Sequence, residues 1–435
     1  MTSSKDSDKD SILNLNHNLF DQLFEGDILL SVPQAKKILY ELEYANFDHK
    51  RTKRQANSAP DSFWTNLTIP YTFRSDYLND SKLIDMVKNG LYHIEKLTCI
   101  RFKAYETSTE LSDRDFLEYF RGGGCFSPVG RQGGGQPISI GRGCDRLDII
   151  AHETLHALGL WHEQSRNDRD EYVLVNYDAI ISDIGSTMHY PSKGFSKDRK
   201  SYTILTKDPN FQQTMGNRAG LSFKDARMIN KRYCKNSCSE KLECSNDGYT
   251  DPNNCNQCRC PDGYSGAFCQ ETPLSTSPFC SSVGFLMAGK WAGKITTGQL
   301  QPNTECYWRI IPHKHEQRIK ITITKLEFPC SDACSSYLEV KAKKKKISTG
   351  ARLCCGTTTT IYSDVDTDVI LILKVSNNLN GTFHGANFEY KSVKASVTVP
   401  QTIQTLPPRI VAIGNGKHPP THSSASETNE ENVIA

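Results

Sequence analysis

The feature that most constrains this chain is a group of three histidines in residues 152–162. His152 and His156 are four residues apart, so on a helix both imidazoles leave the same face, one turn apart. Gly159 can adopt a positive φ and turn the chain back, so that His162 supplies a third nitrogen. Three protein ligands and one open position are typical of a catalytic Zn²⁺ site. Glu153 is then placed to take a proton from a zinc-bound water.

The alternative is that these histidines are ordinary core or surface residues, because a bare H-E-x-x-H motif is only a moderate signal. The extended motif H-E-x-x-H-x-x-G-x-x-H fixes five positions, however, and Ser186-Thr187-Met188-His189-Tyr190 follows downstream. This combination is typical of metzincins. Residues 162–170 continue as HEQSRNDRD. With that continuation the chain resembles the astacin family of zinc peptidases.

The resemblance implies an α+β metzincin catalytic domain over residues 55–234. Met188 would form an apolar floor beneath the histidines. Tyr190 would bind zinc weakly at rest and swing to stabilise the oxyanion, a role that suits a phenol donor. The alternative for Tyr190 is that it only packs under the site.

The resemblance is imperfect in one place. Met188 follows His162 by only 26 positions, fewer than is usual in astacins, and the shortened part falls in residues 177–185. Either this is a compact variant or the sequence lacks an exon. The shortening bears on the placement of Met188 and Tyr190, but not on the histidines or Glu153.

Residues 1–54 read as a pro-segment. Helical spacing of apolar residues runs through residues 11–43, and Phe24-Glu25-Gly26-Asp27 lies within it. Astacin zymogens have a similar motif, which implies that Asp27 occupies the open zinc position; an ordinary turn is the alternative. The basic run 51–54 predicts cleavage after Arg54. The resemblance then implies that the new amino terminus at Gln55 meets Glu163.

Local patterns predict several elements of the catalytic domain. They indicate strands at residues 69–73, 98–102 and 115–120, and helices at residues 81–97 and 222–233. Ser81 is the expected N-cap of the first helix. In metzincins an edge strand above the cleft pairs with extended substrate, and the resemblance makes residues 115–125 the candidate for this edge.

The cysteines indicate the compartment. There are 16, an even number without the repeated C-x-x-C pairs of metal sites, which favours a secreted protein with disulfides. Sequons at Asn66, Asn79 and Asn380 agree with this, although each alone is weak. The first ten residues contain no apolar signal region, so we expect either a start upstream of Met1 or unconventional export. The net charge of +3 argues against nucleic-acid binding, and no stretch is apolar enough to span a membrane.

The second half of the chain predicts three further parts. Residues 235–270 resemble a small disulfide-rich EGF-like module, because six cysteines end in a C-P-D-G-Y-S-G-A-F-C run. Residues 280–392 alternate with a period of two, which predicts an all-β sandwich that resembles a CUB domain. Residues 393–435 are rich in Thr, Pro, Ser and Asn and predict a disordered tail.

Disulfide pairing cannot be deduced from the sequence alone. The family resemblances imply six pairs: Cys99 with Cys234, Cys125 with Cys144, Cys238 with Cys255, Cys244 with Cys258, Cys260 with Cys269, and Cys280 with Cys306. The pairing of Cys330, Cys334, Cys354 and Cys355 stays open, because Cys330 and Cys354 depart from the usual four-cysteine plan of CUB domains.

We therefore expect a secreted zinc endopeptidase that is made as a zymogen and cuts extracellular proteins. By resemblance to nematode astacins, these are matrix, cuticle or eggshell proteins. The CUB domain is a candidate for binding matrix or protein partners. The lysine run 343–346 is expected to be a solvated hairpin, with binding of anionic matrix as the alternative. The rival interpretation is a catalytically impaired adhesion protein, favoured by the short segment before Met188.

Overall fold

The computed structural model describes residues 11–19, 21–44, 56, 59–77, 80–163, 173–175, 185–194, 196, 201–217, 219–280, 284–377 and 385–399. Residues 1–404 belong to one unit of the chain, and a second unit covers residues 405–435. Several predicted features lie outside the described residues: Arg54, Asn79, Asn380, nearly all of the segment 177–185, and the tail beyond residue 399.

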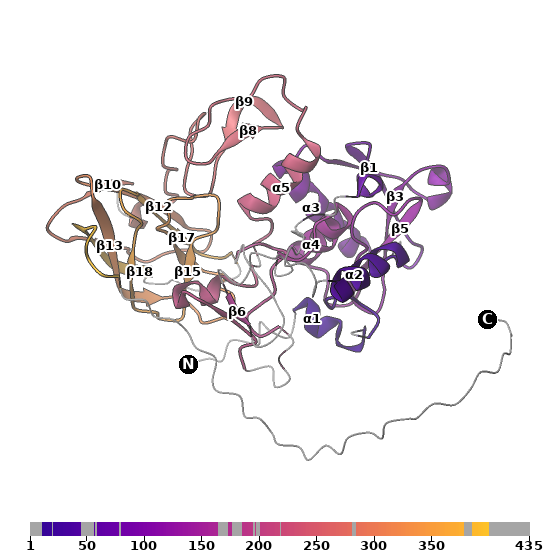
Figure 1. Ribbon diagram of the computed structural model, residues 1–435, viewed down its shortest axis with the longest axis horizontal. Helices are drawn as coiled ribbons and strands as arrows, with labels where there is room; N and C mark the ends of the chain where they lie inside the picture. Colours follow the sequence, from indigo (N-terminus) through magenta and orange to yellow (C-terminus); the bar gives the residue numbers. More distant parts are fainter. Residues whose placement is uncertain are drawn as a thin grey trace, which may run out of the picture. The chain divides into compact units, whose positions relative to one another are not determined.

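The catalytic domain contains a five-stranded sheet in the order β2-β1-β3-β5-β4. Strands β1, β3 and β5 of this sheet are labelled in Figure 1. Strands β2 (Arg101–Ala104), β1 (Thr68–Phe73), β3 (Phe116–Phe120) and β5 (Gly135–Ile140) are parallel. Strand β4 (Cys125–Phe126) is antiparallel to β5 and forms one edge. The strands predicted at residues 69–73 and 115–120 are present. The strand expected at residues 98–102 begins later, at Arg101.

Two helices share a core with this sheet, α3 (Ser81–Leu97) and α4 (Leu147–Ala157). They pack closely, since a Cβ on Gly90 of α3 would lie 2.5 Å from the side chain of Ile150 on α4. The predicted N-cap of α3 was wrong: Asp80, not Ser81, accepts the hydrogen bond from the Leu83 amide. Both residue types suit a cap, and the cap lies one position earlier than the local pattern suggested.

Residues 11–44 do not form one continuous helix. The short helices α1 (Ile12–Leu15) and η1 (His17–Leu19) precede an irregular stretch, and α2 (Val32–Tyr44) follows it. In between, Phe24 and Ile28 pair with each other, and Ile28 also bridges to Ser127 beside β4. The helix predicted from the spacing in residues 11–43 is therefore only partly present. The middle of the segment pairs with the catalytic domain instead, through Ile28 and Ser127.

The remaining catalytic elements are short, except for the last helix. They are η2 (Pro60–Ser62), η3 (Ser108–Leu111), the antiparallel pair of β6 (Val173–Val175) and β7 (Ile204–Thr206), η6 (Pro209–Thr214) and α5 (Phe223–Tyr233). Ser222 and Asp225 form a capping box at the start of α5.

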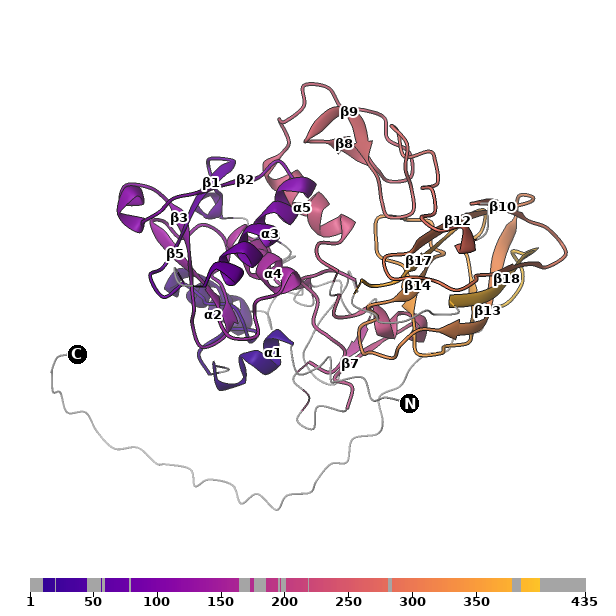
Figure 2. The same ribbon diagram turned by 180° about the vertical axis from the view of Figure 1, so that it is seen from behind.

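Residues 235–270 contain one hairpin, β8 (Tyr249–Asp251) with β9 (Asn254–Arg259) (Figure 2). After η7 (Pro278–Cys280), two sheets form a β-sandwich around one buried core. One sheet has the order β10-β12-β17-β14-β15 and the other β11-β18-β13-β16. The strands are β10 (Phe285–Ala288), β11 (Gly293–Thr296), β12 (Glu305–Pro312), β13 (Gln317–Glu327), β14 (Tyr337–Lys341), β15 (Ala351–Leu353), β16 (Thr359–Tyr362), β17 (Val369–Lys374) and β18 (Gly385–Lys394).

The structure contains eight disulfides. Six join the pairs that the family resemblances imply: Cys99–Cys234, Cys125–Cys144, Cys238–Cys255, Cys244–Cys258, Cys260–Cys269 and Cys280–Cys306. The four cysteines that the sequence left open pair as Cys330–Cys355 and Cys334–Cys354. Within the described residues, no helix has the length and apolar character needed to cross a bilayer.

Candidate metal centre

Helix α4 and the turn after it carry the three histidines. The helix ends at Ala157, and Gly159 adopts a φ of 99°. A side chain at this position would be strained, and its Cβ would also meet the guanidinium of Arg232 at 2.8 Å. The turn brings His162 back to His152 and His156, as the motif predicted. All three side chains are buried.

Each histidine uses its Nδ1 to hold the ring in place. The Nδ1 of His152 donates to the Thr187 carbonyl and that of His156 to the Leu160 carbonyl, both at 2.8 Å. The Nδ1 of His162 lies 2.8 Å from the Glu25 carboxylate. With Nδ1 engaged in this way, the Nε2 atoms of His152 and His156 present lone pairs, which is the arrangement of metal-bound histidines. Burial lowers the pKa of His162, but Asp27 and Glu25 outweigh burial and raise this pKa to about 9, so a metal ion would take the place of the proton on its Nε2.

The three Nε2 atoms converge on the carboxylate of Asp27. His152 and His162 approach within 3.3 and 3.2 Å of its oxygens, and His156 within 3.7 Å. The four ligand atoms lie within 4.8 Å of one another. Among the described residues, the buried Nε2 of His156 has no hydrogen-bond partner. A Zn²⁺ ion fits this donor set, because it would satisfy converging lone pairs that otherwise repel.

The electrostatics of the centre favour an ionised Asp27. Burial opposes its charge, but His162 and the other histidines outweigh burial and lower the pKa of Asp27 well below its ordinary value. For His156, burial and the neighbouring imidazoles lower the pKa, so its ring stays neutral and able to bind metal.

Glu153 is completely buried, and neither of its carboxylate oxygens has a hydrogen-bond partner among the described residues. Burial, together with the charge of Asp27, raises the pKa of Glu153 well above its ordinary value. An unsatisfied carboxyl group is costly in a protein interior, and such groups concentrate at functional sites. This is the environment expected of a general base.

The segment after the short region 177–185 reaches the centre despite the reduced spacing. Met188 is buried in the same core as Leu155 of α4, and the ring of Tyr190 lies 4.6 Å from that of His162. The Tyr190 hydroxyl does not join the four ligands. It donates instead to the Glu25 carbonyl, because Asp27 already occupies the position beside the histidines.

Sequence reasoning missed the residues that hold this segment. Asp225 of α5 accepts hydrogen bonds from the Ser186 hydroxyl at 2.6 Å and the Thr187 amide at 3.0 Å. The carbonyl of Thr187 in turn accepts a hydrogen bond from the Nδ1 of His152. Helix α5, residues 186–188 and α4 are thereby linked. The helix predicted at residues 222–233 included Asp225, but nothing local indicated its second role.

Asn16 is a second residue that the sequence did not single out. Its side chain donates to the Gly26 and Cys125 carbonyls and accepts from the Cys125 amide at 2.7 Å. It therefore pairs with strand β4 as the backbone of an extended peptide would. The amide of Ser127 donates to the Asp27 carbonyl in the same region. Residues 16–28 thus cover the candidate substrate edge.

Glu163, the predicted partner of a new amino terminus, is fully buried and lies 3.2 Å from the ammonium of Lys224. Gln55 lies outside the described residues, so this contact stays a prediction. Asn66, one of the three predicted glycosylation sites, is exposed.

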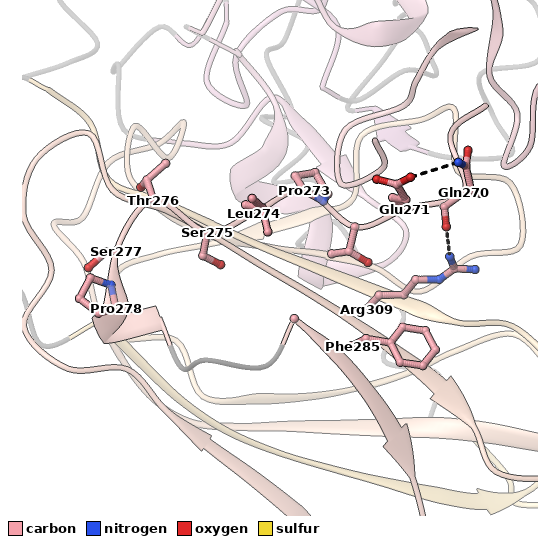
Figure 3. A pocket seen from close by; sticks show the side chains of 12 residues that line it. Gln270, Glu271, Pro273, Leu274, Ser275, Thr276, Ser277, Pro278, Phe285 and Arg309 are labelled. Atoms are coloured by element: carbon pink, nitrogen blue, oxygen red, sulfur yellow. Dashed lines mark hydrogen bonds between the residues drawn. The ribbon is translucent and has the colours of Figure 1, made fainter. Parts of the chain in front are cut away.

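A cavity of about 710 Å³ lies away from the histidines, between residues 270–278 and strand β10 (Figure 3). Its charged lining groups are Glu271 and Arg309. Arg309 pairs with Asp368 at 2.8 Å and donates to the Gln270 carbonyl. The group of metal-ligating side chains found among the described residues lies at the histidine centre and not in this cavity.

A sheet with the edge strand β4, a three-histidine centre and a buried glutamate without a hydrogen-bond partner among the described residues are the features of the zinc-dependent peptidase class. The comparisons with known proteins extend this conclusion. A model of the Astacin peptidase family matches residues 56–184 and 180–234, and a CUB domain model matches residues 289–388. The two astacin matches overlap at residues 180–184, within the shortened segment. The chain belongs to the astacin family of zinc metalloproteinases.

The relatives agree with this assignment. Zinc metalloproteinase nas-37 of Caenorhabditis elegans is 42% identical over 411 residues, covering 90% of this chain and 51% of that protein. Zinc metalloproteinase dpy-31 of Haemonchus contortus is 34% identical over 390 residues, covering 83% and 70%. This chain spans about half the length of the first relatives it matches, nas-37 at 51% and nas-30 at 50%.

Among solved structures, high choriolytic enzyme 1, a hatching enzyme zinc-protease from the medaka Oryzias latipes, is 32% identical. The match has a TM-score of 0.36 and covers 41% of this chain and 97% of that one.

Proposed function

We propose that this chain is a secreted zinc endopeptidase that is made as a latent precursor. The observation that carries the proposal is the buried Glu153 beside three histidines whose Nε2 atoms converge. Eight disulfides support export, because such bonds persist in oxidising compartments. A purely adhesive role is not favoured, because adhesion does not require a buried carboxyl group without hydrogen bonds, which costs stability.

His152, His156 and His162 would hold the zinc ion, which when bound supplies Lewis-acid polarisation of the peptide carbonyl and of water. Glu153 would accept the proton of the attacking water and return it to the leaving amine. Tyr190, once released from Glu25, would donate its hydroxyl to the negative charge that develops on the carbonyl oxygen.

The precursor would be inactive because Asn16, Glu25 and Asp27 occupy the metal centre and the edge strand. Asp27 takes the position next to the three Nε2 atoms, Glu25 engages Tyr190 and His162, and Asn16 covers strand β4. We infer that cleavage after Arg54 releases these contacts, and that the new terminus then pairs with Glu163.

The remaining modules and substrates belong to the same proposal. Residues 235–270 would form an EGF-like module, supported by three disulfides around one hairpin. Asn66 would carry a glycan. Extracellular matrix, cuticle or eggshell proteins are the proposed substrates, by the resemblance to nematode astacins.

The test compares recombinant chain cut after Arg54 with its Glu153→Ala variant. Loss of the base should lower kcat by about 10²–10⁴-fold, the range of general base catalysis. Zinc content, measured by plasma mass spectrometry, should stay at one ion per chain, because Glu153 is not a ligand. Equal turnover by both proteins would refute the proposal.

A further inference from the structure

The CUB domain is joined to the catalytic domain by backbone and side-chain hydrogen bonds around Gln213. The Gln213 carbonyl accepts from the Cys334 amide at 3.2 Å, and its side-chain oxygen accepts from the Cys354 amide at 3.3 Å. The hydroxyl of the neighbouring Thr214 accepts from the Arg352 amide at 2.9 Å. Cys334 and Cys354 form one disulfide, so a cross-linked part of the CUB domain contacts η6 directly.

A buried ion pair lies in the same contact. The Arg352 Nε lies 3.0 Å from the Glu339 carboxylate, and its Nη1 donates to the Asn217 side chain at 3.1 Å. The side chains of Arg352 and Glu339 are 8% and 1% exposed. Since a buried guanidinium needs its donors satisfied, Asn217 of the catalytic domain completes the environment of a CUB residue. Lys193 and Asp332 add a partly exposed pair at 2.8 Å.

A small pocket beside the metal centre is lined by His152, Tyr190 and Pro191. Leu13 of the N-terminal segment also lines it and packs against Tyr190 and Met215 in a buried cluster. Its remaining volume is about 30 Å³. Leu13 therefore takes space next to the reactive centre that opens when the segment leaves.

A larger cleft of about 910 Å³ shares Pro191 and Asp148 with this pocket. One wall is catalytic and includes Met86 and Leu147; the other belongs to the CUB domain. The path from His152 past Pro191 therefore continues along the CUB surface. We propose that the CUB domain forms one wall of an extended substrate cleft, which binds the part of a polypeptide substrate beyond the scissile bond.

The lining indicates which peptides fit. The CUB wall offers hydroxyl and amide groups at Ser331, Ser335 and Asn303, which can bind an extended main chain. Three of the four carboxylates that line the cleft are paired with cations, Asp148 with Arg146, Glu305 with Lys374 and Asp332 with Lys193. Among the described residues, this leaves the exposed Asp145 as the lining carboxylate without an ion pair. The cleft should favour substrates that carry lysine or arginine in this part over those that carry glutamate.

The inference rests on the proposed peptidase function, so the test uses both turnover and binding. Two series of fluorogenic peptides are extended stepwise, one on the amino side and one on the carboxyl side of the scissile bond. They are assayed with mature chain and with Ser335→Trp, which places an indole in the cleft from an exposed position. The matched control is Thr296→Trp, an exposed position on β11 of the other sheet.

We expect kcat/KM to rise roughly tenfold with length in one series, the gain from a few added hydrogen bonds. Ser335→Trp should abolish that rise and leave the shortest peptide unaffected, while Thr296→Trp should keep both. Lysine-containing long peptides should be preferred over glutamate-containing ones by about two- to fivefold, as for exposed charge pairs. Asp145→Asn, which keeps the side-chain shape, should reduce that preference.

The inference is overturned if neither series depends on length, or if the rise survives Ser335→Trp. Fluorescence anisotropy of labelled long and short peptides with the Glu153→Ala chain separates it from the proposed function. Tighter binding of the long peptide, weakened by Ser335→Trp, supports the cleft even if the mature chain cuts nothing. Equal binding of long and short peptides overturns it even if short peptides are cut.

Discussion

At the scale of single residues, Asp27 decides whether the centre is available. Its carboxylate lies 3.2–3.7 Å from the three Nε2 atoms, in the place where water and substrate would bind. Asp27→Ala in the uncut chain should therefore release peptidase activity at least tenfold above the unmodified precursor. The exposed Asp21 in the same segment provides the control, because Asp21→Ala should leave latency unchanged. An Asp27→Ala precursor as silent as its parent would rule out this switch.

Tyr190 gives a second prediction at this scale. In the uncut chain its hydroxyl is engaged by Glu25, and cleavage would free it for the oxyanion. Tyr190→Phe in the mature chain should lower kcat by about 10²-fold, the effect of losing one such donor, with little change in KM. Its zinc content should be unchanged, because the hydroxyl is outside the four-ligand cluster. Full activity of the phenylalanine variant would mean that Tyr190 only packs.

Which site residues the sequence could reveal depends on distance along the chain. His152, Glu153 and His156 belong to one helix, so their spacing alone places them, and Gly159 marks the turn to His162. Asn16 and Asp225 act on residues far along the chain, 109 positions away for Asn16 and Cys125. No local pattern contains such a pairing, because it exists only after the sheet and helices have assembled.

At the scale of elements, the hydrogen bond between α3 and the residues just before α5 predicts that the free energy of unfolding depends on pH. The Nε2 of His93 on α3 accepts a hydrogen bond from the Leu221 amide at 3.2 Å, just before α5. Burial, aided by Lys96 and Arg259, lowers the pKa of His93. A depressed folded-state pKa means that the unfolded chain binds the proton more readily. The contribution of His93 is therefore present above the unfolded pKa of about 6.5 and is lost as the pH falls below it.

Urea unfolding at pH 7.5, 6.5 and 5.5 measures this effect. His93→Gln can keep an acceptor without titrating, so the free energy of unfolding should fall less for the variant than for the parent between pH 7.5 and 5.5. Comparing the two proteins cancels the other histidines. If the free energy of unfolding falls equally with pH in the parent and in His93→Gln, His93 does not contribute to the pH dependence.

Elements with strong periodic patterns could be predicted, and their ends could not. The apolar spacing of residues 81–97 gave both the type and the position of α3, and the alternation within residues 280–392 predicted the β-sandwich. Residues 11–43 show the limit, because Phe24 to Ile28 leave the helical pattern to pair with each other and with Ser127. Tertiary contacts there outweigh local helix preference, which is worth only a few tenths of a kcal/mol per residue, at most about 0.7.

At the scale of the whole molecule, hydrogen bonds connect the catalytic domain, residues 235–270 and the CUB domain. Besides the contacts around Gln213, Tyr264 of residues 235–270 donates to Asp368 of the CUB domain at 2.9 Å. Arg259 of the same module donates to the Lys96 carbonyl of the catalytic domain at 3.0 Å. Inter-domain contacts of this kind couple unfolding when they are numerous enough.

We therefore expect the catalytic and CUB domains to unfold in a single calorimetric transition. Gln213→Ala combined with Lys193→Ala removes side-chain contacts to the CUB domain without altering the core of either domain. Each lost hydrogen bond contributes about 0.5–1.5 kcal/mol, so the double variant should separate into two transitions, the lower one shifted down by a few degrees. Lys320→Ala, on β13 away from this contact, should keep one transition. Two transitions in the unmodified chain would show instead that the CUB domain moves independently, and the fixed wall of the cleft would then have no structural basis.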